Sequence, residues 1–240
     1  MSDLMFVAEI SSNWFGSIDV AKYLHKVAKN AGATHVKYQL WKCDDLYKPD
    51  WKYYEHAKLC ELDYDTARIL KKHAESIGLD WFASVHTKED IDFLVDVKTP
   101  YIKIKGSQST DGELIDYARR TKIPLIISHY GVDYIPPNNY NLYTTDKYPS
   151  KFEDIDFIIF GRDSAHSSYR NGFSDHTKGI QASLCAAMYP NIRIFERHFT
   201  TFLGDEFTIN ECGTPDYCVS LYGFEFKKMV DKIRHIKGEL

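Results

Sequence analysis

Short apolar segments alternate with amphipathic segments along most of this chain, and that alternation restricts the fold more than any other feature. Strands are predicted near residues 6, 36, 81, 102, 125, 142, 172 and 193, and helical periodicity separates most of them. Because a strand, a helix and a following strand form a parallel pair, the pattern builds one parallel sheet. Eight such strands in 240 residues predict an α/β fold, a (β/α)8 TIM barrel that forms a single domain over residues 1–240.

The fifth crossover departs from the alternation. Between Gly131 and Asn141 the sequence carries Pro136 and Pro137, which break a helix. We therefore expect the fifth crossover helix to be reduced or missing. Further on, 154–160 suits either a helix or a strand, and 201–222 is expected to form a long loop. A doubly wound sheet is the alternative fold, but no predicted strand is followed by a Gly-x-Gly-x-x-Gly turn.

The composition indicates a folded protein that binds a small molecule. Hydrophobic residues make up 44% of the chain, and the net charge is -4 with 30 basic residues scattered along the sequence. A nucleic-acid partner is therefore not expected. The chain has no basic leader and no run of 18 apolar residues, so no membrane association is expected. Five cysteines without a Cys-x-x-Cys pair suit a reducing compartment, and we expect a cytoplasmic protein.

Two histidines, His176 and His198, each follow or end a predicted strand on either side of one predicted helix at 179–189. The two strands should be parallel, so both imidazoles should emerge at the same edge of the sheet. Acidic neighbours, Asp175 and Glu196, could orient them. Histidines at strand ends also serve as hydrogen-bonded scaffolding. A two-histidine metal site and a structural role therefore remain equal alternatives at this point.

A second group of polar residues lies on strands that are otherwise apolar. Glu9 follows Phe6-Val-Ala, so it is a candidate for acid–base chemistry or a partner in a structural ion pair. Lys37 and Gln39 alternate onto one face of the second strand. Lys103 precedes a glycine- and hydroxyl-rich loop, 106–110, and the two together predict an anion site.

In a barrel, the loops that follow the strands build the site at one end. That rule gathers the candidates of both groups, together with the residue that ends the fifth strand, at one mouth: Glu9, Lys37, Lys103, Ser128, His176 and His198.

From Ala8 to about Ile233, the sequence resembles the sialic acid synthase family. The motifs that carry the resemblance are Ala8-Glu-Ile with Asn13 and Gly16, Val36-Lys-Tyr-Gln39, Lys103-Ile104, Ile127-Ser128, Tyr148-Pro149 with Glu153-Asp154, Gly172-Phe-Ser-Asp-His-Thr177, Glu196-Arg-His-Phe-Thr200, and Gly213-Thr-Pro-Asp216 with Ser220-Leu221. Any one of these motifs is weak evidence, but the set is specific.

The resemblance implies an enzyme, a transferase that condenses phosphoenolpyruvate with an N-acetylated sugar such as N-acetylmannosamine. It implies that His176 and His198 hold a divalent metal, commonly Mn²⁺, with Mg²⁺ or Co²⁺ as alternatives. It implies that Lys37, Lys103, Ser128 and Ser174 bind the phosphate and carboxylate, and that Glu9 handles a proton. Further substrate-binding positions are Asn13, Gln39, Ser107, Tyr148 and Asp216.

The sequence also departs from the family pattern. Family members usually continue into a small C-terminal antifreeze-like domain that contributes an arginine to the sugar site of a dimer, and this sequence ends at Leu240 without it. Asp146, Val85 and Tyr217 stand where the family favours asparagine, threonine and histidine. The resemblance therefore leaves both the acceptor sugar and the oligomeric state open, and it is compatible with a homodimer or with a complex that includes a partner subunit.

Two alternatives to the synthase follow from the same residues. One is a metal-dependent keto-acid aldolase or lyase, which would not need ligands for phosphate. The other is a non-catalytic barrel that binds a sugar phosphate or needs a partner domain. A barrel requires neither the lysines nor the histidines in order to fold, and their presence favours catalysis.

Overall fold

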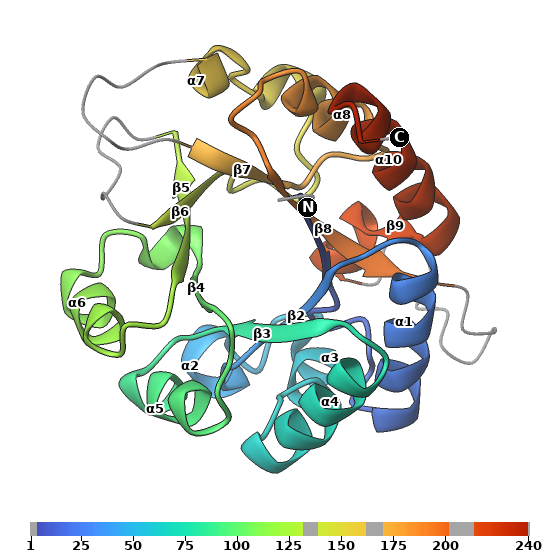
Figure 1. The fold of residues 1–240 in the computed structure, drawn as a ribbon. Coiled ribbons are helices and arrows are strands. Elements are labelled where there is room, and N and C mark those ends of the chain that lie inside the picture. The colour runs from blue at the N-terminus through green and yellow to red at the C-terminus, as the bar shows by residue number, and fades with distance from the viewer. Residues whose placement is uncertain (1–3, 132–138, 162–169, 202–213, 240) are drawn as a thin grey trace.

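A closed ring of parallel strands forms the centre of the molecule (Figure 1). The computed structural model describes residues 4–131, 139–161, 170–201 and 214–239. Within these ranges each strand pairs with the next in sequence, and β1 also pairs with β8, which closes a barrel of eight strands. The strands are β1 (Met5–Glu9), β2 (His35–Gln39), β3 (Asp80–Ser84), β4 (Ile102–Ile104), β5 (Leu125–Tyr130), β6 (Tyr140–Thr144), β7 (Arg170–Asp175) and β8 (Ile194–Thr200). The predicted TIM barrel is confirmed.

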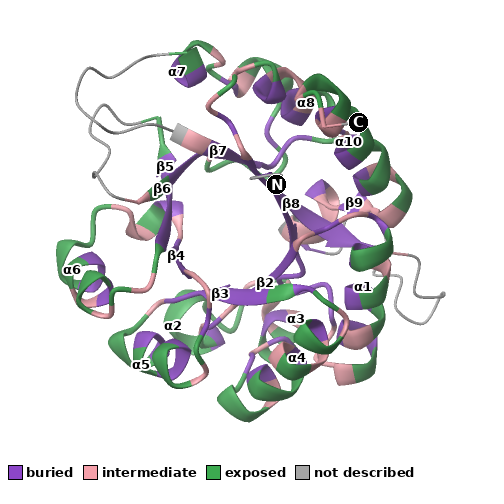
Figure 2. Cartoon of the chain, in the orientation of Figure 1, coloured by how far each residue is buried: buried purple, intermediate pink, exposed green. Residues whose placement is uncertain are grey.

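Helices surround the ring and cover its outer face (Figure 2). They are α1 (Ile18–Asn30), α2 (Cys43–Leu46), α3 (Tyr54–Leu59), α4 (Tyr64–Ser76), α5 (Lys88–Asp96), α6 (Gly112–Arg120), α7 (Ile158–Gly161), α8 (Gln181–Ala187), α9 (Pro215–Val219) and α10 (Gly223–Ile236), with 3-10 turns η1 (Gly106–Gln108) and η2 (Phe152–Asp154). Side-chain caps start several of them, such as Asp63 on α4 and the Thr87–Asp90 capping box on α5. No helix in the described ranges is both long enough and apolar enough to cross a membrane.

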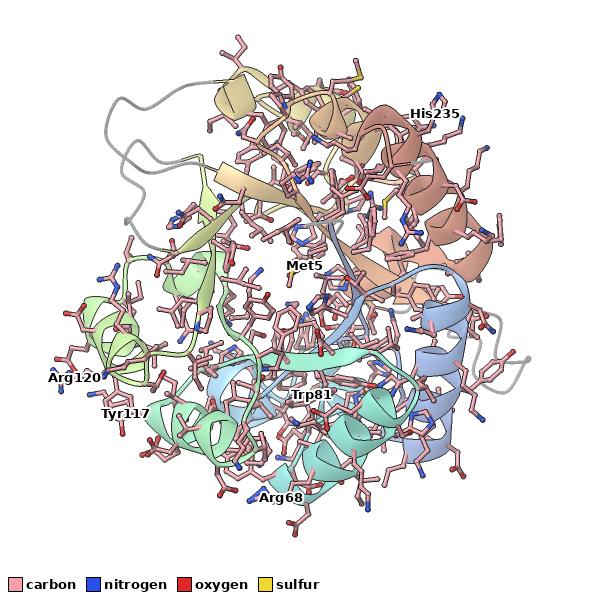
Figure 3. All side chains as sticks on the ribbon, in the orientation of Figure 1. Met5, Arg68, Trp81, Tyr117, Arg120 and His235 are labelled. Atoms are coloured by element: carbon pink, nitrogen blue, oxygen red, sulfur yellow. The ribbon has the colours of Figure 1, made fainter. Side chains whose placement is uncertain are left out.

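The period of two along each strand divides the barrel into layers. On β1, Phe6 and Ala8 join the large core between strands and helices, whereas Met5 and Val7 belong to a separate cluster on the opposite face of the strand. Figure 3 shows Met5 within the ring. A small apolar cluster fills the inside of the barrel: Met5, Val7, Phe82, Ile126, Leu142 and Ile194. Two residues further along the same strands, the inward positions become polar. The apolar cluster therefore lies beneath a polar layer that contains Glu9, Ser84, Ser128 and Glu196.

Two connections differ from a regular strand–helix repeat. Between β5 and β6 only residues 131–139 intervene, which agrees with a shortened fifth crossover, although 132–138 lie outside the described residues. The stretch that suited a helix or a strand ends in the short helix α7.

The stretch expected to be a long loop contains α9 and a short strand, β9 (Leu221–Tyr222), which pairs with β8. Thr214 caps α9 and Pro215 occupies its first turn. Both are helix-start signals. A strand of two residues is too short for a sequence pattern to reveal. The loop prediction was therefore wrong over 215–222, and 202–213 lie outside the described residues.

Arg197 connects the ends of β7 and β8 to α9. Its side chain points away from the barrel interior and is about 1% exposed. It donates to Asp175 Oδ2 at 2.5 Å and to the carbonyl oxygens of Thr177 at 2.6 Å, Gly179 at 2.9 Å and Val219 at 3.2 Å. One guanidinium thus holds three chain segments that border the barrel mouth.

Replacing Arg197 by methionine should destabilise the fold by about 3–5 kcal/mol, because Asp175 would keep a buried charge without its partner. Urea denaturation followed by circular dichroism measures this loss. The matched control is Arg119→Met, which removes an exposed arginine paired with Asp116 at 3.2 Å. That control should change the free energy of unfolding by less than about 0.5 kcal/mol. Equal stabilities of the two variants would contradict the stabilising role assigned to Arg197.

Candidate active site

A polar cavity of about 100 Å³ opens at the carboxyl ends of the strands. We call it the inner chamber. The residues that line it come from every strand of the barrel and from the loops that follow: Glu9, Lys37, Gln39, Ser84, Lys103, Lys105, Gly106, Ser128, Tyr130, Thr144, Tyr148, Ser174, His176, Glu196 and His198. The six residues predicted to meet at one mouth are all among them.

Two lysines and two glutamates form an ion cluster at the base of the inner chamber. Lys37 pairs with Glu9 on the adjacent strand and lies 3.4 Å from Glu196 Oε1. The Nζ of Lys103 donates to Glu196 Oε2 at 3.0 Å and to Ser128 Oγ at 2.8 Å. The Ser174 hydroxyl donates to Glu196 Oε1 at 2.9 Å. All four charged side chains are buried, so each is tolerated only because opposite charges and hydroxyls surround it.

The two carboxylates of this cluster have opposite electrostatic environments. Burial raises the pKa of Glu9 to about 7; the Lys37 ammonium opposes this shift, and the Glu196 carboxylate adds to it. Burial would raise the pKa of Glu196 as well, but Lys103 and Lys37 outweigh it and hold that pKa below its ordinary value. Glu9 can therefore exchange a proton near neutral pH, whereas Glu196 stays ionised.

The backbone after β1 is shaped to hold Glu9. The amide of Ser11 donates to Glu9 Oε1 at 2.9 Å, and Ser11 itself has a φ of 46°. A serine in this left-handed region is uncommon, and such backbone often marks a functional site. The Ser11 hydroxyl then donates to Asp216 Oδ2 at 2.5 Å. The loop after β1 thus links the ion cluster to α9.

His176 and His198 lie close together, with ring centroids 5.5 Å apart. The Nδ1 of His176 donates to the Thr145 carbonyl oxygen at 3.0 Å, so its Nε2 carries a lone pair, and the Tyr148 hydroxyl donates to it at 2.9 Å. Burial and then His198 lower the pKa of His176 to about 3. Burial also lowers the pKa of His198, against the effect of Asp216. Both imidazoles are therefore neutral, which is the form that binds metals.

This pair fits a metal that takes few protein ligands. The Nδ1 of His198 is buried and has no hydrogen-bond partner among the described residues. The Thr145 carbonyl orients His176 in the way that metal-binding histidines are commonly oriented. No group of three or more His, Cys, Asp or Glu side chains that could hold a metal occurs in the described ranges. A cation at this position would complete its coordination with water or substrate oxygens.

A wider cavity of about 290 Å³ continues from the inner chamber toward the mouth. We call it the outer chamber. Both chambers share Gln39, Lys105, Tyr130 and Tyr148, and the outer one is also lined by Ser11, Ser12, Trp41, Tyr47, Trp51, Tyr53, His56, Ala57, Ser107, Thr214 and Asp216. Tyr47 and Trp51 stack with their centroids 4.1 Å apart. The connection between β2 and α3 therefore gives this chamber an aromatic wall.

The predicted substrate-binding residues divide into three groups. Ser128, Ser174, Gln39 and Tyr148 line the inner chamber, and Ser107 and Asp216 line the outer one. Asn13 borders neither chamber. It is buried, and its amide donates to the Phe199 carbonyl oxygen at 3.0 Å and to Ser220 Oγ at 2.8 Å. Its contacts are those of a residue that fastens the loop after β1 to the end of β8.

Sequence reasoning assigned no substrate role to Glu196, Lys105, Ser84 or the aromatic wall. Glu196 stands two residues before His198, so the alternation of β8 placed both on one face and could have revealed it. The wall carries no comparable signal. Its aromatic residues lie in a stretch without periodicity, and only the packing of α2 and α3 brings them to the mouth.

A model of the NeuB family matches residues 24–135 and 138–240. The chain belongs to the NeuB family. Two curated relatives are similar to this chain over most of its length. The N,N'-diacetyllegionaminic acid synthase of Legionella pneumophila is 26% identical over 95% of this chain and 70% of its own length. The N-acetylneuraminate-9-phosphate synthase of Homo sapiens is 26% identical over 98% of this chain and 70% of its own length.

A solved structure agrees with the barrel. The N-acetylneuraminic acid synthetase of Leptospira borgpetersenii, in complex with citrate, superposes with a TM-score of 0.85 over 98% of this chain and 84% of that chain. Sequence identity is 18%, so this similarity supports the fold alone. The NeuB family assignment rests on the family model.

Replacing Glu196 by glutamine should lower the pKa of Lys103 further below its value of about 8, by about one unit or more. Burial already lowers this pKa, and Glu196 is the carboxylate that opposes the shift most. NMR titration of the lysine side chains measures the change. Glu113→Gln, which removes an exposed partner of Lys88, is the control and should leave Lys103 unchanged. An unaltered Lys103 in the Glu196 variant would disprove the coupling.

Proposed function

We propose that this barrel, over residues 1–240, condenses phosphoenolpyruvate with the aldehyde of an N-acetylated amino sugar and yields a sialic-acid-like nonulosonic acid and phosphate. The observation that carries the proposal is the ion cluster beside two neutral imidazoles at the carboxyl ends of the strands. Membership of the NeuB family and the activities for which its legionaminic and neuraminic acid relatives are named support the same chemistry.

The inner chamber suits the three-carbon substrate, which carries a carboxylate and a phosphate. Lys37 and Lys103 are buried cations there, and the Ser128 and Ser174 hydroxyls already contact the same cluster. On binding, the anionic groups would take over some of the hydrogen bonds that Glu196 now accepts. In a dry site such charge-assisted bonds are stronger than in water, so they also fix the orientation of the substrate methylene.

The proposed reaction forms one carbon–carbon bond and breaks one carbon–oxygen bond. The methylene carbon of phosphoenolpyruvate attacks the aldehyde carbon, and the aldehyde oxygen takes up a proton. Water then adds to the cationic carbon that carries the phosphate and loses a proton. Finally the new hydroxyl on that carbon gives its proton to the departing phosphate as the bond between the carbon and the phosphate oxygen breaks, which leaves a keto acid and inorganic phosphate. Neither oxidant nor reductant is required.

Glu9 is the proposed proton acceptor for the attacking water. Its carboxylate faces the inner chamber, and burial brings its pKa to about 7, close to the working pH of a general base. Lys37 pairs with it and would stabilise the carboxylate form. Glu196 has the opposite assignment because its pKa is held low; it stays charged and keeps Lys103 protonated.

We propose that His176 and His198 hold a divalent metal, with Mn²⁺ as the first candidate and Mg²⁺ or Co²⁺ as alternatives. Such an ion supplies a Lewis acid that polarises the aldehyde oxygen. The orphaned Nδ1 of His198 and the carbonyl-oriented ring of His176 support this assignment. Asp216, whose Oδ1 lies 3.8 Å from His198 Nε2, would orient that ring.

The outer chamber is the proposed place for the sugar. Aromatic side chains bind the apolar faces of sugars and acetamido methyl groups, and Gln39, Ser107 and Asp216 offer hydrogen bonds to hydroxyls. Tyr148 borders both chambers and His176, so it would lie between the two substrates. Asn13 would act indirectly by holding the loop after β1.

The first test incubates the protein with Mn²⁺, phosphoenolpyruvate and a panel of N-acetylated sugars, and measures sugar-dependent phosphate release. The His176→Ala and His198→Ala variants should lose both metal binding and turnover. Lys103→Ala should lower kcat/KM about a hundredfold, because a charge-assisted hydrogen bond contributes about 1.5–3 kcal/mol. An aldolase would instead release pyruvate and tolerate the Lys103 change. Metal-loaded protein that stays silent on every sugar would refute the synthase.

The pH profile of kcat/KM should be bell-shaped. Activity should rise through about pH 7, because Glu9 must lose its proton to act as a base. It should fall through about pH 8, because Lys103 then loses the charge that binds the substrate. Glu9→Gln should abolish most turnover, and the activity that remains should no longer rise through about pH 7. If that rise persisted in the variant, it would have to be assigned to another titrating group.

A further inference from the structure

Lys105 differs from the other lysines of the site in having no counter-charge. Lys37 and Lys103 each contact glutamates, whereas the ammonium group of Lys105 makes no hydrogen bond or ion pair with any residue that the structure describes. It is half-buried and borders both the inner and the outer chamber. An aliphatic chain folded into a polar cavity with an unpaired ammonium is a poor arrangement for stability.

The strand geometry fixes where this ammonium stands. Lys105 follows Lys103 by two residues at the end of β4, so both side chains lie on the inward face. Lys103 reaches the base of the inner chamber, and Lys105 lies one step nearer the mouth. Gly106, the next residue, packs against Tyr130, where an added Cβ would lie 2.7 Å from the ring. The segment that carries Lys105 is therefore held in place.

The ion cluster of the inner chamber lacks the net positive charge that an anionic substrate requires, and Lys105 would supply it. Lys37 and Lys103 are balanced by Glu9 and Glu196, so the cluster has little net charge to offer a substrate with a carboxylate and a phosphate. Lys105 is the remaining ammonium among the described residues that line the chamber. Its pKa is lowered to about 8, by burial first and by Lys37 second, so it stays mostly protonated near neutral pH.

Ser84 gives an independent indication of a ligand at the same level. Its hydroxyl is about 1% exposed, lines the inner chamber and has no hydrogen-bond partner among the described residues. Ser84 is the register partner of Lys103 on the adjacent strand. A buried hydroxyl without a partner is costly unless a ligand or water completes it.

We propose that Lys105, assisted by Ser84, is a third anchor for phosphoenolpyruvate and binds its phosphate at the mouth side of the inner chamber. This inference rests on the proposed function, because it takes phosphoenolpyruvate as the substrate. Lys105 supplies the positive charge that the ion cluster lacks. Ser84 supplies a hydroxyl donor that needs no rearrangement of the cluster.

Calorimetric titration of metal-free protein with phosphoenolpyruvate, inorganic phosphate and pyruvate tests the proposal without turnover. Lys105→Met should lower the affinity for phosphoenolpyruvate about tenfold to a hundredfold, as expected for one charge-assisted hydrogen bond. It should lower the affinity for inorganic phosphate similarly and leave the affinity for pyruvate, which lacks the phosphate, unchanged. Lys105→Arg should restore most of the affinity. Ser84→Ala should show a smaller loss with the same ligand pattern.

The control is Lys72→Met, which removes the same charge from an exposed position on α4 and should leave all three ligands unaffected. The melting temperature of Lys105→Met should match that of the unaltered protein, because the Lys105 ammonium has no partner to lose among the described residues. The proposal would be overturned if Lys105→Met lowered the affinity for pyruvate and left the affinity for inorganic phosphate unchanged. It would also be overturned if the variant bound phosphoenolpyruvate as tightly as the unaltered protein does.

The two proposals fail in different ways. Protein that binds phosphoenolpyruvate through Lys105 but forms no product with any sugar would refute the condensation and keep the anchor. Protein that forms product while Lys105→Met retains full affinity would refute the anchor and keep the condensation.

Discussion

Mutual compensation of buried charge is the interaction on which this barrel mouth depends. Four strands of the ring contribute the ion cluster: Glu9 comes from β1, Lys37 from β2, Lys103 from β4 and Glu196 from β8. Strand register places Glu9 beside Lys37 on one side and beside His198 on the other. A shift of one strand by one residue would turn its charged side chain toward the helices. The cluster therefore restricts register as firmly as the apolar cluster beneath it, and the same restriction arranges the groups that would act on a substrate.

The cluster also gives residues of the same type different ionisation behaviour. Two glutamates within reach of the same lysine have their pKa values moved in opposite directions, because Glu196 has two ammonium neighbours and Glu9 has one. The histidines are treated alike: burial keeps both neutral, and backbone and carboxylate groups orient them. Position in the barrel, rather than residue type, thus determines which side chain stays charged, which exchanges a proton and which offers a lone pair.

Much of the fold could be predicted because every strand is short, apolar and separated from the next by a helix or a turn signal. The period of two placed Lys37 on one face of its strand, and the rule that a barrel builds its site at one end predicted that Lys37 and Lys103 would meet His176 and His198. Sequence patterns could not show that Glu196 joins two lysines, or that the Lys105 ammonium has no partner in the part of the chain that the structure describes, since both depend on distances across the ring. The aromatic wall and β9 were missed because the first has no periodicity and the second is only two residues long.

The aromatic wall comes from one connection, which runs from Trp41 to Tyr53, whereas the ion cluster is contributed by four strands, β1, β2, β4 and β8. Changes in this connection can therefore accumulate without disturbing the charged base. Under the proposed function, exchanging that single segment between relatives would alter which sugar binds and would leave the charged residues for the anionic substrate unaltered.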